Sequence, residues 1–444
     1  MRTQAPLDAA TVESLLAAAV AAPSIHNTQP WRFRLDADRQ VLEVHSAPER
    51  TLPLTDPMHR AQYLSVGAAV FNLRLAAVHL GRRPEVRLLP DHHTPGLLAA
   101  VRLTGPLGAD DQPSDPGLYE AIARRHTSRM PFTGRPVPEP IVAEMARAAQ
   151  SADARLHIPD IAGTRRLLRL TAAAEARNRA HPERSTETLT WLTAPGSDAS
   201  YGIPVTALGP PDAAGRMPMR DFTSPLPALR RPAHFFERHV QLGLLWTPRD
   251  QREDWLRAGQ ALQYVLLTAT THGLRTSLLH QAMEWSDLRA ATALPRDKRC
   301  HPQVLIRFGY GPEGGRTPRA GDRPGAVAGD SSYCVPPVPL SSRPVTISDS
   351  IRTNTASRRG IHDAGPACCS RSCSSGSVTT VARPVTTTLQ PDRVAGSNSS
   401  ASKATTTPSM ARTRSESGEV RSRTEAFVSR EKLMGRTAGS ACRV

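Results

Sequence analysis

The sequence predicts an α+β fold in which one chain carries two duplicated lobes, followed by a tail without a core. Three observations lead to this prediction. Helical and strand-like apolar patterns alternate up to about residue 308, one helix pattern recurs at a fixed offset, and the composition changes abruptly near residue 325. A chain of 444 residues has room for about three units of roughly 150 residues. We place the first lobe at residues 1–115, the second at 116–324 and the tail at 325–444.

One helix pattern occurs twice, 192 residues apart. GAAVFNLRLAAVHLG spans residues 67–81, and GQALQYVLLTATTHG spans residues 259–273. The first and last glycines and three interior positions are identical in the two copies. Each copy precedes a strand candidate, Val86–Leu89 or Leu274–Leu279. Two Ala-rich helices can resemble each other by chance, but a duplicated α+β unit also accounts for the strands.

The first lobe is predicted to begin with a helix and a hairpin. Asp8–Ala22 contains the apolar run LLAAAVAA, and Pro23 ends the helix. Trp31–Leu35 and Val41–His45 alternate apolar and polar residues on either side of a polar turn, as paired strands do. Leu97–Leu103 is a further strand candidate.

The second lobe is predicted to repeat this mixture of elements. Helices are expected at Leu118–Arg125, at Glu139–Ala149, where prolines suit a helix start, and at Gly163–Ala180. Strands are expected at Leu156–Ile158 and Val304–Phe308.

A long irregular stretch, His181–Arg249, interrupts the second lobe. It is rich in Pro, Gly and Arg and shows little periodicity. A stretch of that length inside a compact domain is normally functional or disordered. We favour a lid insertion made of fixed turns over a disordered segment.

The composition excludes several classes of protein. The run LLAAAVAA is far shorter than the roughly 20 apolar residues of a membrane span and lacks the basic flank of a signal peptide. Of six cysteines only Cys300 precedes residue 325, so neither a disulfide framework nor a zinc knuckle is expected in the lobes. These features favour the reducing cytoplasm and no membrane partner.

The net charge of +16 is concentrated in the tail. Residues 325–444 carry 16 Lys and Arg against 8 Asp and Glu, while the other 324 residues carry 40 against 32. Ser and Thr fill 36 of the 120 tail positions, so a disordered tail is expected and a nucleic-acid-binding arm is the alternative. The tail also resembles out-of-frame translation of GC-rich DNA, a hypothesis that sequencing the 3′ end of the gene tests.

Two polar clusters could bind a ligand. APSIHNTQPWRF, residues 22–33, places five hydrogen-bonding side chains between a helix and a strand. IARRHTSRMPF, residues 122–132, combines arginines and hydroxyls in a way that suits a phosphate monoester. Each also has a local explanation, a helix-terminating turn for the first and a solvated basic turn for the second. A third basic segment, RTPR at 316–319, follows the last predicted strand.

Together the pattern PSxxNxQPW, a later RHTSR and a terminal TPR segment resemble the FMN-dependent nitroreductase family. The fold implied by this resemblance is an intertwined homodimer with FMN at the interface. Here the PSxxNxQPW loop lies in the first half of the chain and the basic motifs in the second. One chain would therefore imitate the dimer, as in the two-lobed Acg-like branch of actinobacteria. The Gly-Ile-Pro sequence at 202–204 matches an element of that branch's insertion.

The resemblance implies a role for each matching residue. The FMN phosphate and the pyrimidine edge of the ring would be held by Arg125, Thr127 and Arg129, with His126 beside them. The phosphate would be covered by Arg316 and Arg319. The ring would be met from the other lobe by Pro23, Ser24 and Asn27.

The resemblance also implies that flavin N5 is approached by backbone N–H groups of Leu279, His280 and Gln281. The family often has an acidic residue and a glycine at this place, where this chain has His280 and Gln281. Each half of the chain lacks the motif that would complete a second site, so one flavin per chain is expected.

The leading functional hypothesis is an FMN oxidoreductase that passes hydride from NAD(P)H to a nitro- or quinone-type small molecule. The alternative is an FMN-binding protein with little turnover, because the insertion covers the flavin. No side chain is expected to act as a covalent nucleophile, no metal or specific nucleic-acid site is expected, and the chain is expected to be a monomer or weak dimer.

Overall fold

The computed structural model describes residues 7–108, 117–194, 199–223, 231–294, 297 and 299–320. The predicted tail, 325–444, lies outside the described residues. The first part of the chain forms α1 (Ala9–Val20), β1 (Trp31–Asp36), β2 (Val41–Ser46), α2 (Arg60–His79), β3 (Arg82–Leu88) and β4 (Leu97–Pro106).

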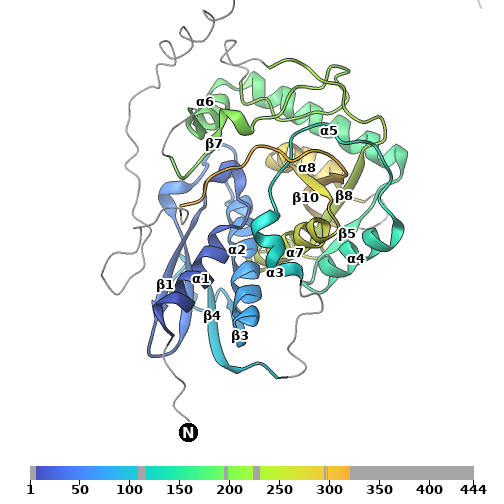
Figure 1. Ribbon diagram of the computed structural model, residues 1–444. Helices are drawn as coiled ribbons and strands as arrows, with labels where there is room; N and C mark the ends of the chain where they lie inside the picture. The colour runs from blue at the N-terminus through green and yellow to red at the C-terminus, as the bar shows by residue number, and fades with distance from the viewer. Residues whose placement is uncertain are drawn as a thin grey trace, which may run out of the picture. The chain divides into compact units, whose positions relative to one another are not determined.

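The second part contains more elements (Figure 1). They are α3 (Gly117–Arg124), α4 (Glu139–Gln150), β5 (Arg155–His157), α5 (Ile161–Ala180), α6 (Pro182–Thr190), β6 (Leu192–Thr193), β7 (Ile203–Pro204), β8 (Gln241–Thr247), α7 (Arg252–Thr271), β9 (Arg275–Leu279), α8 (Ser286–Thr292) and β10 (His301–Gly309). Each helix and strand predicted from the apolar patterns is present at or near its expected position.

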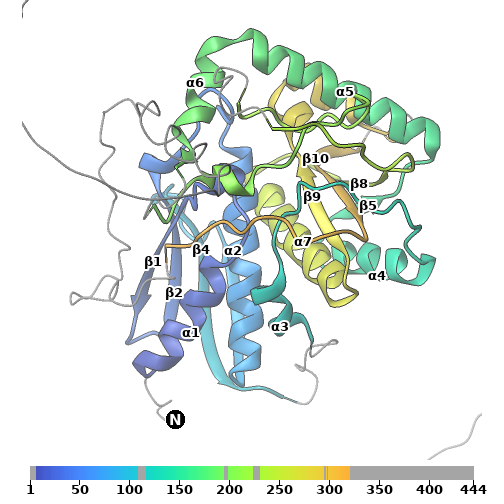
Figure 2. The ribbon, with the colours of Figure 1, turned by 45° about the horizontal axis from the view of Figure 1, so that its top comes forward.

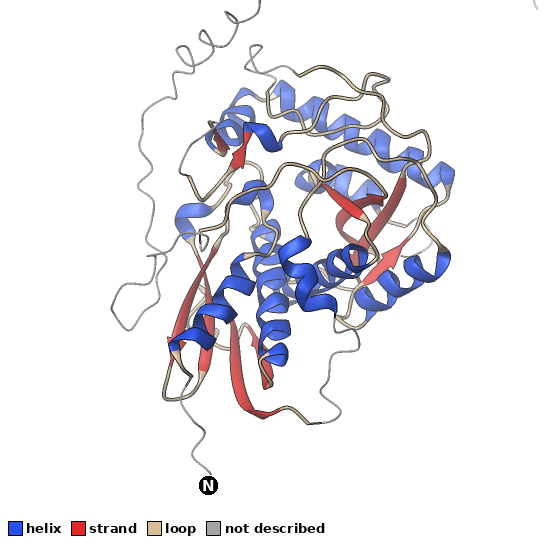
Figure 3. Ribbon diagram, in the orientation of Figure 1, coloured by secondary structure: helices blue, strands red, loops and turns tan. Residues whose placement is uncertain are grey.

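The two large sheets have the same topology, which supports the predicted duplication. Their strand orders are β1-β2-β4-β3 and β5-β8-β10-β9, and all neighbouring strands in both are antiparallel. In each unit a central helix, α2 or α7, leads into an edge strand, β3 or β9. The next strand, β4 or β10, then returns beside it. Figure 3 shows the two sheets on opposite sides of the central helices.

The equivalent strands of the two sheets give the predicted insertion different bounds. The equivalents of β1 and β2 are β5 and β8, so the extra chain lies between them, at residues 158–240 rather than 181–249. The expectation that residues 181–249 lack regular structure is also wrong, because they contain α6 and, at their end, the sheet strand β8. The apolar run of β8 is short and broken by Gly243, where a Cβ would lie 2.7 Å from the Leu156 side chain. We call residues 158–240 the insertion.

The insertion makes the two sheets differ in burial. Along β4, the equivalent of β10, buried residues alternate in part with half-buried and exposed ones such as Arg102. On β10, by contrast, eight successive residues are buried. Val304 and Ile306 join the core shared with α7, whereas Leu305 joins a second core with α5 and α8. Figure 2 shows α5 of the insertion over the face of the second sheet opposite α7.

The helices α2 and α7 cross at the two glycines of the repeat. A Cβ on Gly67 would lie 2.1 Å from the Leu256 carbonyl oxygen, and a Cβ on Gly259 would lie 2.1 Å from the Leu64 carbonyl oxygen. No side chain larger than hydrogen fits at this backbone contact. The glycines that end the two copies, Gly81 and Gly273, also match, with φ of 72° and 71°.

The helix α2 is long and apolar enough to cross a membrane by length and composition alone. It is 83% buried inside the fold, where it packs against α1, α3 and α7. A helix that is apolar all around is typical of the centre of a protein core.

The crossing makes Gly67 sensitive to substitution. We expect Gly67→Ala to lower the free energy of unfolding by about 1–3 kcal/mol, the usual cost of overpacking, despite the better helix propensity of alanine. Chemical denaturation measures the change. Gly96→Ala is the control, because its Cβ would lie 3.6 Å from the Ser46 hydroxyl oxygen, an ordinary contact, and its φ is not positive. Equal stability of Gly67→Ala and the parent chain would contradict the proposed backbone contact.

Candidate functional site

A cavity lies where the two lobes, the insertion and the last described segment meet. About 1140 Å³ of space lies between its walls, part of it open solvent. Its walls come from the loop 23–27, the first turns of α2, the loop 125–129, the end of β9 with the turn after it, the insertion, and the segment 315–319. In Figures 1 and 2 that last segment runs from β10 across to the first lobe.

The loop between α1 and β1 has a strained backbone. His26, Asn27 and Gln29 have φ of 49°, 56° and 48°, values that are uncommon for residues other than glycine. Ser24 helps to hold this shape, because its hydroxyl accepts a hydrogen bond from the Gln29 amide at 3.0 Å. Strain of this kind persists only where surrounding contacts enforce it.

Those contacts come from segments far away in the sequence. The Asn27 amide donates to the carbonyls of Gly202 in the insertion and Pro318 in the last segment, both at 2.9 Å. Its carbonyl oxygen accepts from Arg319 at 2.7 Å. Gln29 similarly donates to the Ser200 carbonyl at 2.7 Å and accepts from the Ala320 amide at 3.0 Å. The polar loop therefore fastens the insertion and the last segment to the first lobe.

One end of the cavity, which we call the basic end, is formed by Arg125, His126, Thr127 and Arg319. Burial lowers the pKa of Arg125 to about 9, and the neighbouring cation Arg319 acts in the same direction. Arg125 donates to the Ala21 carbonyl at 3.2 Å. Within the part of the chain that the structure describes, its Nε and the Nε2 of His126 are buried without a partner. A buried guanidinium whose charged neighbour is another cation is suited to bind an anion.

The loop that carries the basic end is held by a buried ion pair. Arg307 of β10 is fully buried and contacts both carboxylate oxygens of Glu237 at 2.7 Å. Arg307 also donates to the Met130 carbonyl, and Glu237 accepts from the Phe132 amide. The position of Arg129 within the cavity wall therefore depends on this pair.

Another part of the cavity wall contains a buried carboxylate, Glu284. It pairs with Arg220 of the insertion and accepts from Arg184 at 3.3 Å and Asn178 at 3.2 Å. Burial would raise the pKa of Glu284, but the Arg220 guanidinium and His280 outweigh burial and hold the pKa at about 2. We call Glu284, Arg220, Arg184 and His280 the Glu284 cluster.

His280 lies between this carboxylate and a buried arginine. Arg60 of α2 donates to His280 Nε2 at 3.2 Å, and His280 Nδ1 lies 3.5 Å from Glu284. Because Arg60 is a donor only, Nε2 must accept and Nδ1 carries the hydrogen. Burial lowers the pKa of His280, so its imidazole is neutral at neutral pH.

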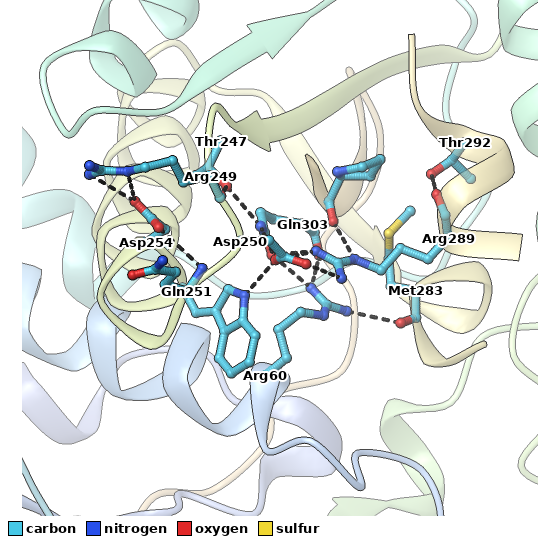
Figure 4. A network of polar contacts seen from close by, with 12 residues as sticks. Arg60, Thr247, Arg249, Asp250, Gln251, Asp254, Met283, Arg289, Thr292 and Gln303 are labelled. Atoms are coloured by element: carbon cyan, nitrogen blue, oxygen red, sulfur yellow. Dashed lines mark hydrogen bonds and ion pairs between the residues drawn. The ribbon is translucent and has the colours of Figure 1, made fainter. Parts of the chain in front are cut away.

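A polar network supports the turn that carries these residues (Figure 4). Arg60 donates to the carbonyls of Gln303 and Met283, and Arg289 donates to both carboxylate oxygens of Asp250 at 2.6 and 2.8 Å. Burial opposes ionisation of Asp250, but the hydrogen bonds from Arg289 and Trp255 hold its pKa well below its usual value. The network fixes the turn after β9 beneath the cavity.

Most of the residues expected to bind the cofactor line this one cavity. They are Pro23, Ser24, Asn27, Arg125, His126, Thr127, Arg129, Leu279, His280, Gln281 and Arg319. The exception is Arg316, which is exposed and does not line it. The Gln281 amide donates to the Pro218 carbonyl of the insertion at 3.0 Å, so this side chain fastens the insertion.

Sequence reasoning did not select His26, Glu284 or Arg220 as site residues. His26 had a signal, because it lies inside the polar loop. Glu284 follows His280 by four residues, a spacing common to many residue pairs. Arg220 had no signal, because its place depends on how the insertion folds back over the cavity.

Comparison with known proteins identifies relatives of this chain. "Putative NAD(P)H nitroreductase Rv3131" of Mycobacterium tuberculosis (strain ATCC 25618 / H37Rv) is 34% identical over 315 residues, which cover 70% of this chain and 88% of that protein. "Putative NAD(P)H nitroreductase acg" of the same strain is 31% identical over 323 residues, 70% of this chain and 92% of the other. No protein-family model matches the chain.

Solved structures with similarity to this chain include nitroreductases. A putative nitroreductase in complex with FMN from Desulfovibrio desulfuricans has a TM-score of 0.28 and 16% identity, covering 48% of this chain and 95% of that one. NfnB from Mycobacterium smegmatis in complex with NADPH has a TM-score of 0.27 and 16% identity, covering 43% and 86%. Scores this low add nothing to the assignment of fold or function.

The Glu284 cluster gives stability a defined pH dependence. Because the pKa of Glu284 falls from 4.5 to about 2 on folding, its contribution is complete above pH 4.5 and is lost as the pH falls towards 2. We expect Glu284→Gln to cost about 3–5 kcal/mol at pH 7, since it leaves buried arginines without a carboxylate. The difference from the parent chain should shrink as the pH falls below 4.5.

Thermal unfolding measured at pH 7, 4.5 and 3 tests this expectation. Glu313→Gln is the control, because Glu313 forms an exposed ion pair with Arg275 and should matter little at any pH. A deficit for Glu284→Gln that stays constant between pH 7 and 3 would show that Glu284 does not titrate in this way.

Proposed function

The chain belongs to the NAD(P)H nitroreductase family, in the branch that includes Acg, and from this premise we propose that it is an FMN-dependent oxidoreductase. Its cavity would bind one FMN per chain, NAD(P)H would be the electron donor, and a small nitro- or quinone-type molecule would be the acceptor. Bound FMN supplies the redox chemistry, since its ring accepts and returns a hydride, while the protein positions the ring and controls access to it.

The observation that carries this proposal is the basic end of the cavity. Arg125 is buried beside a second arginine, and its Nε and the Nε2 of His126 have no partner among the described residues. A dianionic phosphate would satisfy these groups and offset the charge of Arg125. The residues of the site therefore fit a flavin phosphate at this end.

The remaining lining residues have distinct parts in the proposal. Arg129, whose pKa burial lowers to about 10, would meet the pyrimidine edge of the ring. Pro23 and Ser24 would contact the ring from the first lobe. Asn27 would contribute packing alone, because both its N–H groups and its oxygen are already bonded within the protein. The backbone of Leu279, His280 and Gln281 would face the ring, held from below by Arg60 and its network.

The alternative function, storage of FMN with little turnover, is favoured by the way the insertion is fastened. Ile203, Met219, Arg220 and Phe222 of the insertion line the cavity. The insertion is tied down at Asn27, Gln29, Gln281 and Glu284, in both lobes. If these ties never open, a hydride donor cannot reach the ring. If they open on the microsecond-to-millisecond timescale of lids, turnover follows.

The same premise leads to proposals on the oligomeric state of the chain and on its cellular compartment. Each chain supplies both lobes of the site, so we propose that it acts as a monomer or weak dimer. Cys300 is a free, buried thiol among the described residues, and we propose the cytoplasm as its compartment.

The basic end can be tested by flavin retention. We expect the protein to purify with about one FMN per chain, and Arg125→Ala combined with Arg129→Ala to lose it. Each charged hydrogen bond lost costs about 1.5–3 kcal/mol. Flavin content is measured from absorbance after gel filtration. The control, Arg316→Ala, should keep its FMN, because Arg316 is exposed and outside the cavity wall. A double variant that stays loaded, or a protein that carries FAD or two flavins, would refute the proposed site.

Access to the flavin distinguishes a reductase from a protein that only stores FMN. Phe222 is buried in a small apolar cluster with Ile203, Ala207 and Leu208, so Phe222→Ala should loosen the insertion over the cavity. Under anaerobic conditions we expect NADPH to bleach the flavin severalfold faster in this variant while FMN stays bound. Phe235→Ala, at a position 78% exposed on the same insertion, is the control. Equal bleaching rates in the variant and the parent chain would show that this part of the insertion does not limit access.

A further inference from the structure

His26 combines a place in the cavity wall with a side-chain nitrogen that lacks a partner among the described residues. Ser24, Asn27 and Gln29 have hydrogen-bond partners within the protein. Thr28 Oγ1 is also buried without a partner among the described residues, but Thr28 does not line the cavity. The His26 side chain lines the cavity and is only 6% exposed, and its Nε2 has no partner among the residues that the structure describes. A buried polar atom of this kind in a cavity wall is suited to bind a ligand.

The surroundings of His26 keep it uncharged. Its ring packs edge-on against Phe222, with ring centres 5.5 Å apart. Burial lowers the pKa of His26 well below its usual value, and the cations Arg220 and Arg129 and the imidazole of His280 act in the same direction. Glu284 opposes them but is already paired with Arg220. His26 is therefore a neutral imidazole, with one nitrogen able to donate and one able to accept.

The position of His26 suits the acceptor better than the phosphate. The groups around it are Phe222 and Arg220 of the insertion, His280 and Glu284 of the Glu284 cluster, and Arg129, which we assign to the edge of the ring and not to the phosphate. Residues of the insertion line the cavity, so a second molecule bound beside His26 lies against the insertion.

We propose that His26 binds the acceptor: its Nε2–H donates a hydrogen bond to a carbonyl oxygen of a quinone or to a nitro oxygen. This proposal rests on the proposed oxidoreductase function and names the residue that selects its acceptor. When the acceptor is reduced, negative charge develops on that oxygen, and a neutral imidazole N–H fixed beside it stabilises the charge. His26 keeps its proton throughout, and the proton that completes the reduced product comes from solvent.

The left-handed backbone supports this assignment. At φ of 49°, histidine and asparagine are among the few side chains that are tolerated. This conformation projects the imidazole into the cavity while Asn27 turns away to its own partners in the insertion and the last segment.

The test uses the oxidised, FMN-loaded protein, which can bind a nitro compound without reducing it. Nitrobenzene and toluene are matched probes of similar shape, one with a nitro group and the other with a methyl group in its place. Their dissociation constants are measured from the change that each causes in the visible flavin spectrum. We expect the parent chain to bind nitrobenzene about three- to tenfold more tightly than toluene, the range of one hydrogen bond.

Removing the donor should abolish this preference. His26→Phe keeps an aromatic ring against Phe222 and should bind the two probes equally, with toluene affinity within about twofold of the parent chain. His26→Asn retains an N–H donor and suits the left-handed backbone, so it should recover part of the preference. In His26→Gly, added free imidazole should restore nitrobenzene binding by filling the vacated space.

Flavin content and the ligand-free spectrum distinguish the possible failures. A parent chain without FMN would overturn the proposed function itself. If the parent chain is loaded, an unchanged preference in His26→Phe would overturn the role of His26. Loss of FMN from both His26→Phe and His26→Asn would also overturn it, because His26 would then hold the cofactor and not the acceptor.

Discussion

The backbone contact between α2 and α7 is the constraint on which the rest of the structure depends. Hydrogen is the only side chain that fits at Gly67 and Gly259, because each position faces a carbonyl oxygen of the opposite helix. This close approach brings the two four-stranded sheets to opposite sides of one helix pair (Figure 3). It also shapes the cavity, since Leu64, whose carbonyl faces Gly259, lines the cavity wall.

The Glu284 cluster and the basic end differ in how their buried charges are balanced. In the Glu284 cluster, a fully buried carboxylate balances Arg220 and Arg184. At the basic end, the charged neighbour of Arg125 is a second arginine, and burial has lowered its pKa accordingly. A buried guanidinium beside another cation is costly, so a site of this kind is stabilised when an anionic group binds. A ligand with one anionic end would therefore bind with that end beside Arg125.

The polar loop after α1 has both a structural and a chemical part. Asn27 and Gln29 fasten the insertion and the last described segment to the first lobe, and His26 faces the cavity. Because these residues are adjacent, any movement that frees the insertion also affects the cavity wall. The same hydrogen bonds that complete the site thus control how readily it opens. This coupling is why one fold is compatible with both a reductase and a flavin store.

Much of the fold was decided by local sequence. The repeated helix, its terminal glycines and the alternating strands specify the duplicated unit, because apolar periodicity and left-handed glycines act over a few residues. The basic and polar motifs likewise supplied eight of the predicted residues that line the cavity, and the resemblance to the nitroreductase family added Leu279, His280 and Gln281. The tertiary structure decided what depends on distant segments. It placed β8 inside the sheet, left Arg316 outside the cavity, engaged Asn27 in fastening, and brought Arg220 and Glu284 beside His26. Those outcomes depend on which groups remain without partners once the two lobes and the insertion have packed, and that is a property of the whole fold.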